Sequence, residues 1–203
     1  MRPRPLRVAL TGGIATGKSH CLRRFRERGA PVIDADALAH DVVRPGTPGA
    51  DAVIRRFGTL DRAALGAVVF DDARARADLE AIIHPLVYGA INEWFSALRN
   101  AAFGIADIPL IFETGHAADF DRVLITYCPP DQQQQRLVAR GLTAADAERR
   151  MASQLPFEAK IARAKAVGVP VDVIDTSGTP AITDDQVDRI IERLGSLPPR
   201  VCS

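Results

Sequence analysis

The chain has 203 residues, of which 47% are hydrophobic and 25% are charged, with 26 basic and 25 acidic side chains. This composition is typical of a globular protein with a core of its own, and it excludes a disordered acidic tail. The formal net charge of +1 argues against a protein that coats nucleic acid, because such proteins usually have a basic excess.

Short apolar runs alternate with amphipathic stretches along the chain. Five of these runs predict strands, at residues 6–11, 31–34, 105–112, 122–127 and 169–174. Helices are expected over residues 17–28 and near 144–153, and a last helix is expected to begin at Thr183 and end at Gly195. This alternation predicts an α/β fold with three layers, in which helices cover both faces of a five-stranded parallel sheet.

The stretch between the second and third predicted strands is far longer than a simple connection. Residues 34–100 contain helical patterns and are expected to form an insertion beside a nucleotide-binding core of residues 1–33 and 101–195. Within the insertion, Pro85 predicts the start of a new helix, because proline fits a helix start better than a helix middle. Part of the core, residues 131–165, is rich in basic side chains and is expected to form a helical lid.

The sequence predicts neither a membrane segment nor a signal peptide. No run approaches 18 consecutive apolar residues, and the apolar run near the N-terminus ends at Thr11. The cysteines Cys21, Cys128 and Cys202 lie far apart, which predicts reduced thiols and no zinc site. We therefore expect a cytoplasmic protein, with a flexible tail at residues 196–203.

A glycine-rich motif follows the first predicted strand and opens the first predicted helix. It matches the P-loop pattern G-x-x-x-x-G-K-[ST] with Gly12, Gly13, Ile14, Ala15, Thr16, Gly17, Lys18 and Ser19. The backbone N–H groups of a P-loop bind phosphate oxygens, and the following helix adds its positive end. Lys18 is expected to reach the β- and γ-phosphates of a nucleotide, and the Ser19 hydroxyl is expected to bind Mg²⁺. A purely structural glycine-rich turn is the weaker alternative in this context.

A P-loop indicates a nucleoside triphosphate without fixing the reaction. A GTPase would need an Asn-Lys-x-Asp motif, which the sequence lacks. A motor or transporter ATPase usually needs an apolar strand that ends in Asp, and we expect the comparable strand here to end in Glu113. These observations favour a small-molecule kinase, which needs an acceptor pocket and a carboxylate that orients the acceptor hydroxyl.

Candidate carboxylates follow two of the predicted strands. Asp34 and Asp36 are expected to point the same way on an extended chain and to face the γ-phosphate. One of them would then accept the proton of the attacking hydroxyl, although a helix cap is the alternative for either residue. Glu113 is expected in the same row, where it would hold Mg²⁺ through water or fix an arginine; the alternative is a solvated strand end.

Several motifs together make the chain resemble the dephospho-CoA kinases over about residues 6–194. In chain order they are LTGGIATGKS, VIDADALAHDVVRPG, the FG…LDRAALGAVVF…LEAIIHP block, IPLIFETG, QQQRLVARGLT, the region of Gln154, and VIDTSG. These enzymes use ATP to phosphorylate the ribose 3′-hydroxyl of dephospho-CoA in the last step of CoA biosynthesis. The resemblance therefore implies ATP and Mg²⁺ as cofactors and dephospho-CoA as the acceptor. We expect no nucleic acid, membrane or obligatory protein partner.

The resemblance also implies roles for individual residues. Asp36 would be the base that activates the 3′-hydroxyl, and Arg140 would reach the ATP phosphates from the lid. Residues 34–100 would bind the acceptor, and the implied substrate residues are Asp34, Asp36, Arg62, His84 and Glu113. His20 would join the cofactor-binding residues, where relatives usually have Thr. Thr176 stands where many relatives have an Asn near the adenine, which leaves the base selectivity open.

Two other functions stay open on the sequence alone. One is another P-loop kinase, acting on nucleosides or nucleotides, and the block at residues 57–85 argues against it. The other is a non-catalytic ATP-binding switch, which would bind ATP through the same loop without acceptor-dependent release of ADP. An assay with different acceptors separates all three functions.

Overall fold

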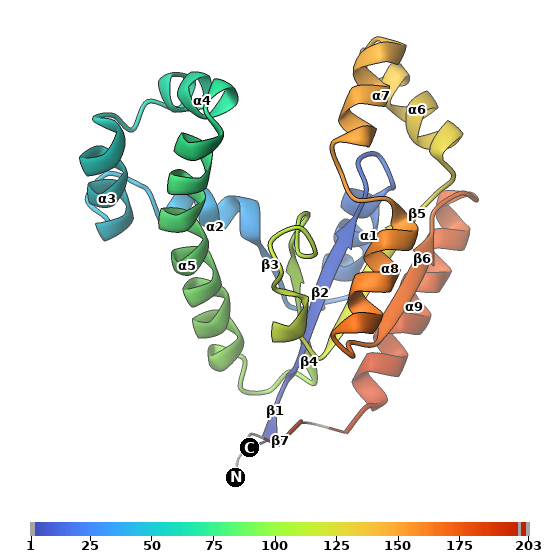
Figure 1. The fold of residues 1–203 in the computed structure, drawn as a ribbon. Helices are drawn as coiled ribbons and strands as arrows, with labels where there is room; N and C mark the ends of the chain where they lie inside the picture. The colour runs from blue at the N-terminus through green and yellow to red at the C-terminus, as the bar shows by residue number, and fades with distance from the viewer. Residues whose placement is uncertain (1–2, 199, 202–203) are drawn as a thin grey trace. The chain divides into compact units, whose positions relative to one another are not determined.

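The computed structural model describes residues 3–198 and 200–201 (Figure 1). The chain divides into two compact units. The core unit consists of the described residues of Met1–Ile33 and Leu98–Ser203, and the helical unit consists of Asp34–Ala97. Among the helices described, none is both long and apolar enough to cross a membrane.

A five-stranded sheet forms the centre of the core unit, in the spatial order β3-β4-β2-β5-β6. Its strands are β2 (Leu6–Gly12), β3 (Val32–Asp34), β4 (Phe103–Asp107), β5 (Arg122–Tyr127) and β6 (Val171–Asp175). β2 pairs in parallel with both β4 and β5, and β5 pairs in parallel with β6. Each of the five predicted runs overlaps one of these strands, so the predicted parallel α/β sheet is confirmed.

Helices cover both faces of this sheet, as Figure 1 shows. The helices of the core unit are α1 (Lys18–Glu27), η1 (Ala117–Asp119), α6 (Pro130–Ala139), α7 (Ala144–Ala152), α8 (Phe157–Ala166) and α9 (Pro180–Ser196). Because side chains alternate along a strand, Leu6, Val8 and Leu10 of β2 share one face, where they pack with α1 and α9 in a buried cluster. On the other face, the ring of Phe157 in α8 lies 4.5 Å from the ring of Tyr127.

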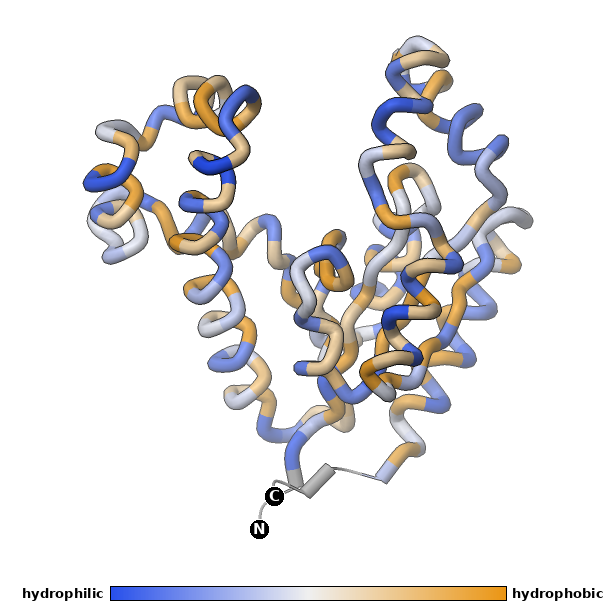
Figure 2. Tube along the Cα trace, viewed as in Figure 1, coloured by the Kyte–Doolittle hydropathy of each residue, from blue (hydrophilic) through white to orange (hydrophobic). Residues whose placement is uncertain are grey.

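Hydropathy follows this arrangement within the core unit. Figure 2 shows hydrophobic residues along the central strands, mostly hydrophilic residues along α6, and a mixture of both along α7. Strands that are covered on both faces need apolar side chains on both sides, which explains the nearly continuous apolar runs in the sequence.

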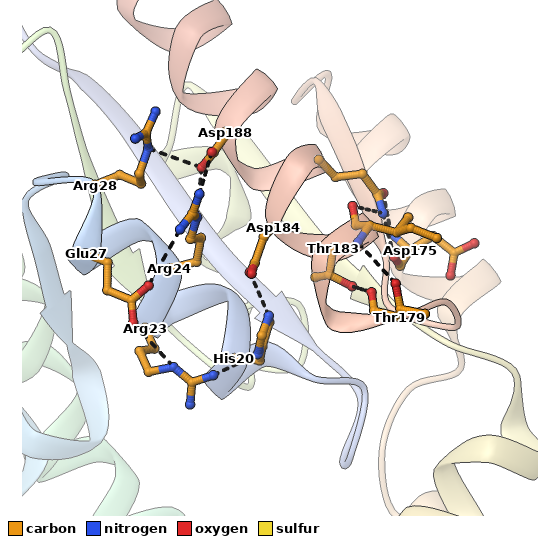
Figure 3. Close-up of polar contacts among 12 residues, drawn as sticks. His20, Arg23, Arg24, Glu27, Arg28, Asp175, Thr179, Thr183, Asp184 and Asp188 are labelled. Carbon is orange, nitrogen blue, oxygen red and sulfur yellow. Dashed lines mark hydrogen bonds and ion pairs between the residues drawn. The ribbon is translucent and has the colours of Figure 1, made fainter.

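Polar contacts join α1 to α9 beside the buried cluster (Figure 3). Arg24 Nη2 lies 2.6 Å from Asp188 Oδ2, and Arg24 Nε donates to Asp188 Oδ1 at 2.9 Å. This two-point contact holds the pKa of the Asp188 carboxyl below its usual range, because the guanidinium hydrogen-bonds the charged form. The ion pair therefore links α1 to α9 beside the apolar contacts between them.

The start of α9 differs from the prediction. The helix begins at Pro180, which needs no N–H partner at this position, and the Thr179 side chain caps its first turn. Thr183, the predicted cap, is buried inside the helix (Figure 3). Gln186, the predicted partner of that cap, instead donates through Nε2 to the backbone oxygen of Asp175 at 2.7 Å. The capping-box pattern was therefore assigned one turn too late.

The helical unit, all of whose residues are described, consists of α2 (Ala35–Asp41), α3 (Pro48–Phe57), α4 (Arg62–Asp71) and α5 (Ala73–Ala97). α5 packs against the other three helices. It runs through Pro85 without a break, so the prediction that a new helix begins there is wrong. Pro85 removes one backbone hydrogen bond, but packing along the rest of α5 keeps the helix continuous.

The chain termini also carry a small element. β1 (Pro3–Arg4) pairs with β7 (Arg200–Val201) in an antiparallel ladder. Residues 196–203 were predicted to form a flexible tail, and part of that stretch is thus in a strand. Residues 199, 202 and 203, and with them Cys202, lie outside the described residues.

Burial of Cys21 predicts a pH-dependent loss of stability. Cys21 is fully buried in the cluster between α1 and the sheet, and burial raises the pKa of its thiol from about 9 to about 12. The unfolded chain binds fewer protons than the folded chain in this range, so the stabilisation is complete below pH 9 and is lost as pH rises. We expect a loss of about 1.4 kcal/mol per pH unit between about pH 9 and pH 12.

The substitution Cys21→Ala isolates this contribution from other titrating groups. The variant is expected to be less stable at pH 7 but to lose stability less steeply above pH 9. Urea unfolding of both proteins at several pH values measures the two slopes. Identical slopes would contradict the assignment of the pH dependence to Cys21.

Candidate functional site

The P-loop joins β2 to α1 and lines a cavity of about 210 Å³. Residues 12–20 line it together with Pro109, Arg140 and Gln154. Gly17 has a φ of +85°, and a Cβ there would lie 3.0 Å from Thr176 Oγ1. A Cβ on Gly12 would lie only 2.0 Å from the Thr126 hydroxyl, so Gly12 is required by space and Gly17 by its positive φ. The structure therefore brings together the predicted phosphate-binding loop and Arg140, at the end of α6.

Lys18 forms an ion pair at the edge of this cavity. Its Nζ lies 2.5 Å from Oδ1 of Asp107, the last residue of β4. Asp107 is only 4% exposed. An acidic side chain at the end of an apolar strand therefore stands directly beside the P-loop lysine.

Glu113 was predicted to be the acidic residue at the end of this strand, and that prediction is wrong. β4 ends at Asp107, and residues 109–115 form turns instead of continuing the strand. Proline at position 109 has no N–H to donate to a neighbouring strand, which explains the early end. The signal was present in FGIAD at residues 103–107, a buried apolar run that ends in Asp. The chain therefore has an apolar strand that ends in Asp, so this feature does not exclude a motor or transporter ATPase.

Asp34 and Asp36 have different environments. Asp34 caps α2: its Oδ1 accepts hydrogen bonds from the N–H groups of Asp36 at 2.9 Å and Ala37 at 3.2 Å. Because α2 begins at Ala35, Asp36 lies in a helical first turn and not on an extended chain. The expectation that both carboxylates point the same way is therefore wrong. The Asp36 side chain is exposed, and its carboxylate has no hydrogen-bond partner among the residues the structure describes.

Glu113 anchors the start of α8. Its Oε1 accepts hydrogen bonds from Lys160 Nζ at 2.7 Å and from the backbone N–H of Leu155 at 3.3 Å. Lys160 is 1% exposed, so this is a nearly buried ion pair within the core unit. Glu113 thus fixes a lysine where the sequence suggested an arginine, and it does not follow a strand.

His20 contacts α9 through one ring nitrogen and Arg23 through the other (Figure 3). Its Nε2 lies 2.8 Å from Asp184 Oδ1, and Arg23 Nη2 lies 2.9 Å from Nδ1. Since arginine can only donate, Nδ1 accepts and Nε2 carries the proton that it donates to Asp184. His20 lines the P-loop cavity, but its ring is held by protein groups.

Arg62 and His84 belong to the helical unit. Arg62 begins α4, and its Nη2 lies 2.6 Å from Nε2 of His40. His84 lies inside α5 and is partly buried. Their expected contact with an acceptor stays a prediction.

Arg136 ties three segments of the core unit together. From α6, its guanidinium donates to the backbone oxygens of Ala15 at 3.1 Å and Thr176 at 2.6 Å. It also donates to Thr176 Oγ1, which in turn donates to the backbone oxygen of Thr16 at 2.7 Å. Thr176 is thus packed beneath the P-loop. The arginines of this segment were predicted to belong to a lid, and the family resemblance singled out Arg140 among them, but no local pattern singles out Arg136.

Loss of the Arg136 contacts should loosen the P-loop. We expect Arg136→Gln to lower the free energy of unfolding by about 2–3 kcal/mol, because two backbone oxygens and the Thr176 hydroxyl lose a charged donor. Urea unfolding measures the loss. The matched control Arg189→Gln removes an exposed arginine that pairs with Asp185 on α9, and it should cost less than about 1 kcal/mol. Equal losses in the two variants would show that Arg136 is an ordinary surface residue.

Comparison with known proteins decides among the P-loop classes. A sequence model described as dephospho-CoA kinase matches residues 6–172. The chain belongs to the dephospho-CoA kinase family. A dephospho-CoA kinase of Anaeromyxobacter dehalogenans (strain 2CP-C) is 42% identical over 211 aligned residues, which cover 95% of this chain and 97% of the relative. The resemblance seen in the sequence motifs is thereby confirmed.

Solved structures agree on the fold. The crystal structure of TT1252 from Thermus thermophilus has a TM-score of 0.79 at 29% identity and covers 94% of this chain and 98% of its own. Dephospho-CoA kinase from Campylobacter jejuni has a TM-score of 0.67 at 24% identity and covers 93% and 96%. The α/β architecture described above is therefore that of solved members of the same fold. Membership of a kinase family also makes ATP a substrate of this chain.

Proposed function

We propose that this chain transfers the γ-phosphoryl group of ATP to the ribose 3′-hydroxyl of dephospho-CoA and releases CoA and ADP. The proposal rests on one observation: a complete P-loop with Lys18 at its cavity, in a chain of the dephospho-CoA kinase family. Phosphoryl transfer needs positioned phosphates, charge that offsets the transferring group, and an oriented acceptor hydroxyl. The chain offers a residue for each requirement.

The P-loop and two cations meet the first two requirements. N–H groups of residues 12–19 would bind the phosphate oxygens, and Lys18 would exchange Asp107 for the β- and γ-phosphates. Arg140 lines the same cavity and would add positive charge beside the transferring group.

Asp36 would meet the third requirement. The 3′-oxygen attacks the γ-phosphorus as the bond to the β–γ bridging oxygen breaks, and the 3′-hydroxyl proton passes to the Asp36 carboxylate. Two features support this assignment. The Asp36 carboxylate is exposed and has no hydrogen bond within the described part of the chain, whereas the Asp34 carboxylate is engaged by the cap of α2.

The Ser19 hydroxyl and the Asp107 carboxylate are the groups that would hold Mg²⁺. Both are hard oxygen donors, and Mg²⁺ is usually bound by one or two side chains together with substrate phosphates and waters. Ser19 lines the P-loop cavity, and Asp107 is buried beside Lys18. When bound, the ion offsets charge on the phosphates.

The two units would bind different substrates. The helical unit would bind the acceptor, with Arg62 and His84 as candidate contacts. Residues 131–165, which contain α7 and most of α6 and α8, would form the lid, and the exposed arginines Arg140, Arg149 and Arg150 support this. Reduced thiols at Cys21 and Cys128 agree with a cytoplasmic location, since both are free and buried.

An acceptor assay tests the proposed function. Purified protein with ATP and Mg²⁺ is given dephospho-CoA, a nucleoside, a nucleoside monophosphate or no acceptor, and ADP release is followed. We expect release with dephospho-CoA only, and a product heavier by one phosphate at the 3′ position. Release with nucleosides instead would identify another P-loop kinase. ATP binding without acceptor-dependent release would identify a switch.

A further inference from the structure

The side chain of Gln154 occupies an N–H group of the P-loop. Its Oε1 accepts a hydrogen bond from the backbone N–H of Ile14 at 2.7 Å. Because an N–H can only donate, the carboxamide oxygen faces the loop and the amino group points away from it. P-loop N–H groups are donors for phosphate oxygens. The oxygen of Gln154 therefore stands where a phosphate oxygen is expected.

Two phosphate-binding groups thus have protein oxygens as partners. Ile14 N–H is bonded to Gln154, and Lys18 Nζ is bonded to Asp107. A triphosphate that uses both groups must displace both partners. The partners differ in their location, since Asp107 ends a buried strand and Gln154 lies in the loop between α7 and α8.

The loop around Gln154 is fixed at neighbouring positions. The N–H of Leu155 donates to Glu113, which is itself held by the buried Lys160. The N–H of Gln154 donates to the backbone oxygen of Met151 at the end of α7, at 3.2 Å. The backbone is therefore tied to α7 and α8, and the contact with Ile14 is made by the side chain alone.

Gln154 also forms part of the wall between two cavities. A second cavity of about 340 Å³ shares Gly13, Thr16 and Gln154 with the P-loop cavity. Within residues 3–198 the Nε2 group of Gln154 has no hydrogen-bond partner. The carboxamide therefore has space to turn and two free donors to offer after it turns.

We propose that Gln154 is a nucleotide-binding residue that responds to the terminal phosphate; the proposal rests on the proposed function, in which ATP is the phosphoryl donor. Ile14 lies near the start of the loop, away from the helix end at Lys18, and the geometry assigns it to the outermost phosphate. When the γ-phosphate takes the Ile14 N–H, the carboxamide turns and Nε2 donates to a γ-phosphate oxygen. ADP lacks this phosphate and leaves the contact between Gln154 and Ile14 in place.

Calorimetric titration with a non-hydrolysable ATP analogue and with ADP tests the proposal. We expect Gln154→Leu to weaken binding of the analogue roughly tenfold, as loss of a hydrogen bond to a charged group predicts, and to change ADP binding less than about twofold. The control Gln135→Leu replaces an exposed glutamine of α6 and should change neither. Equal weakening of both nucleotides would make Gln154 merely structural and overturn the proposal, as would no change in either.

Amide exchange provides a second readout. In the unaltered protein we expect exchange at residues 153–155 to change with the ATP analogue and not with ADP. Gln154→Glu keeps an acceptor for the Ile14 N–H but lacks the donor, so the loop should exchange as in the parent without nucleotide and respond weakly to the analogue. A full response in this variant would overturn the proposal. Neither measurement needs an acceptor, so nucleotide binding without phosphorylation of dephospho-CoA would refute only the proposed function.

Discussion

Lys18→Ala is expected to lower kcat/KM for ATP by roughly a thousandfold, the size of effect seen when one donor to a developing charge is removed. Lys18 lines the P-loop cavity, and its ammonium group is the expected partner of the β- and γ-phosphates. The loss should appear mostly in kcat, because charge on the leaving and transferring groups grows toward the transition state. Steady-state rates at varied ATP concentration measure both parameters.

Loss of the ion pair with Asp107 is expected to affect the stability of Lys18→Ala as well as its rate, and a second substitution at Asp107 separates the two effects. Without Lys18, the carboxylate of Asp107 stays buried beside an uncharged side chain, which lowers stability. The double variant Lys18→Ala, Asp107→Asn should recover stability without recovering rate. Lys165→Ala removes an exposed lysine of α8 and should leave both unchanged. A Lys18→Ala enzyme with near-parental kcat would refute the role of the P-loop lysine.

Local sequence patterns were sufficient to predict the strands of the sheet and the P-loop. Each strand of the sheet is a short apolar run bounded by glycine, proline or charged residues, so its position can be read without tertiary contacts. The P-loop is equally local, since its glycines are needed for space at Gly12 and for a positive φ at Gly17. Element ends were less predictable. β4 ends at Asp107 and α9 begins at Pro180, and in both cases a proline near the boundary decides.

The rest of the candidate site depends on contacts between distant segments. Arg136 contacts Ala15, which is 121 residues away in the sequence, and Gln154 contacts Ile14, which is 140 residues away. Arg136 also contacts Thr176, which is 40 residues away. No periodicity or spacing along the chain encodes such pairs, so the sequence could place these residues in a lid segment and go no further. The contact of the Glu113 carboxylate could not be predicted for the same reason, because its partner Lys160 is 47 residues away in the sequence.

The continuity of α5 also shows that a local sequence signal can be overridden by tertiary packing. Pro85 is a reliable local signal against a helix interior, and it is overridden here by packing with α2, α3 and α4. Asp34 and Asp36 show how a short shift in a helix boundary changes chemistry. The start of α2 at Ala35 makes Asp34 the cap of the helix and leaves the Asp36 side chain exposed.

This difference predicts the outcome of Asp36→Asn. We expect kcat for dephospho-CoA phosphorylation to fall by about a hundredfold to ten-thousandfold, the usual contribution of a general base. Asparagine has nearly the same size but cannot take the hydroxyl proton, so ATP binding measured by calorimetry should change less than about twofold. The fall should be in kcat rather than in KM for ATP, since the base acts on the acceptor.

A matched control lies on the same helix. Asp41→Asn removes an exposed carboxylate at the end of α2 that pairs with Arg44, and it should leave kcat within about twofold, because surface ion pairs contribute little. The two variants differ only in position, so any general effect of removing charge from α2 appears in both. A near-normal kcat for Asp36→Asn would refute the base assignment, and because Asp34 is held by the cap, the base would then have to come from outside this pair of residues.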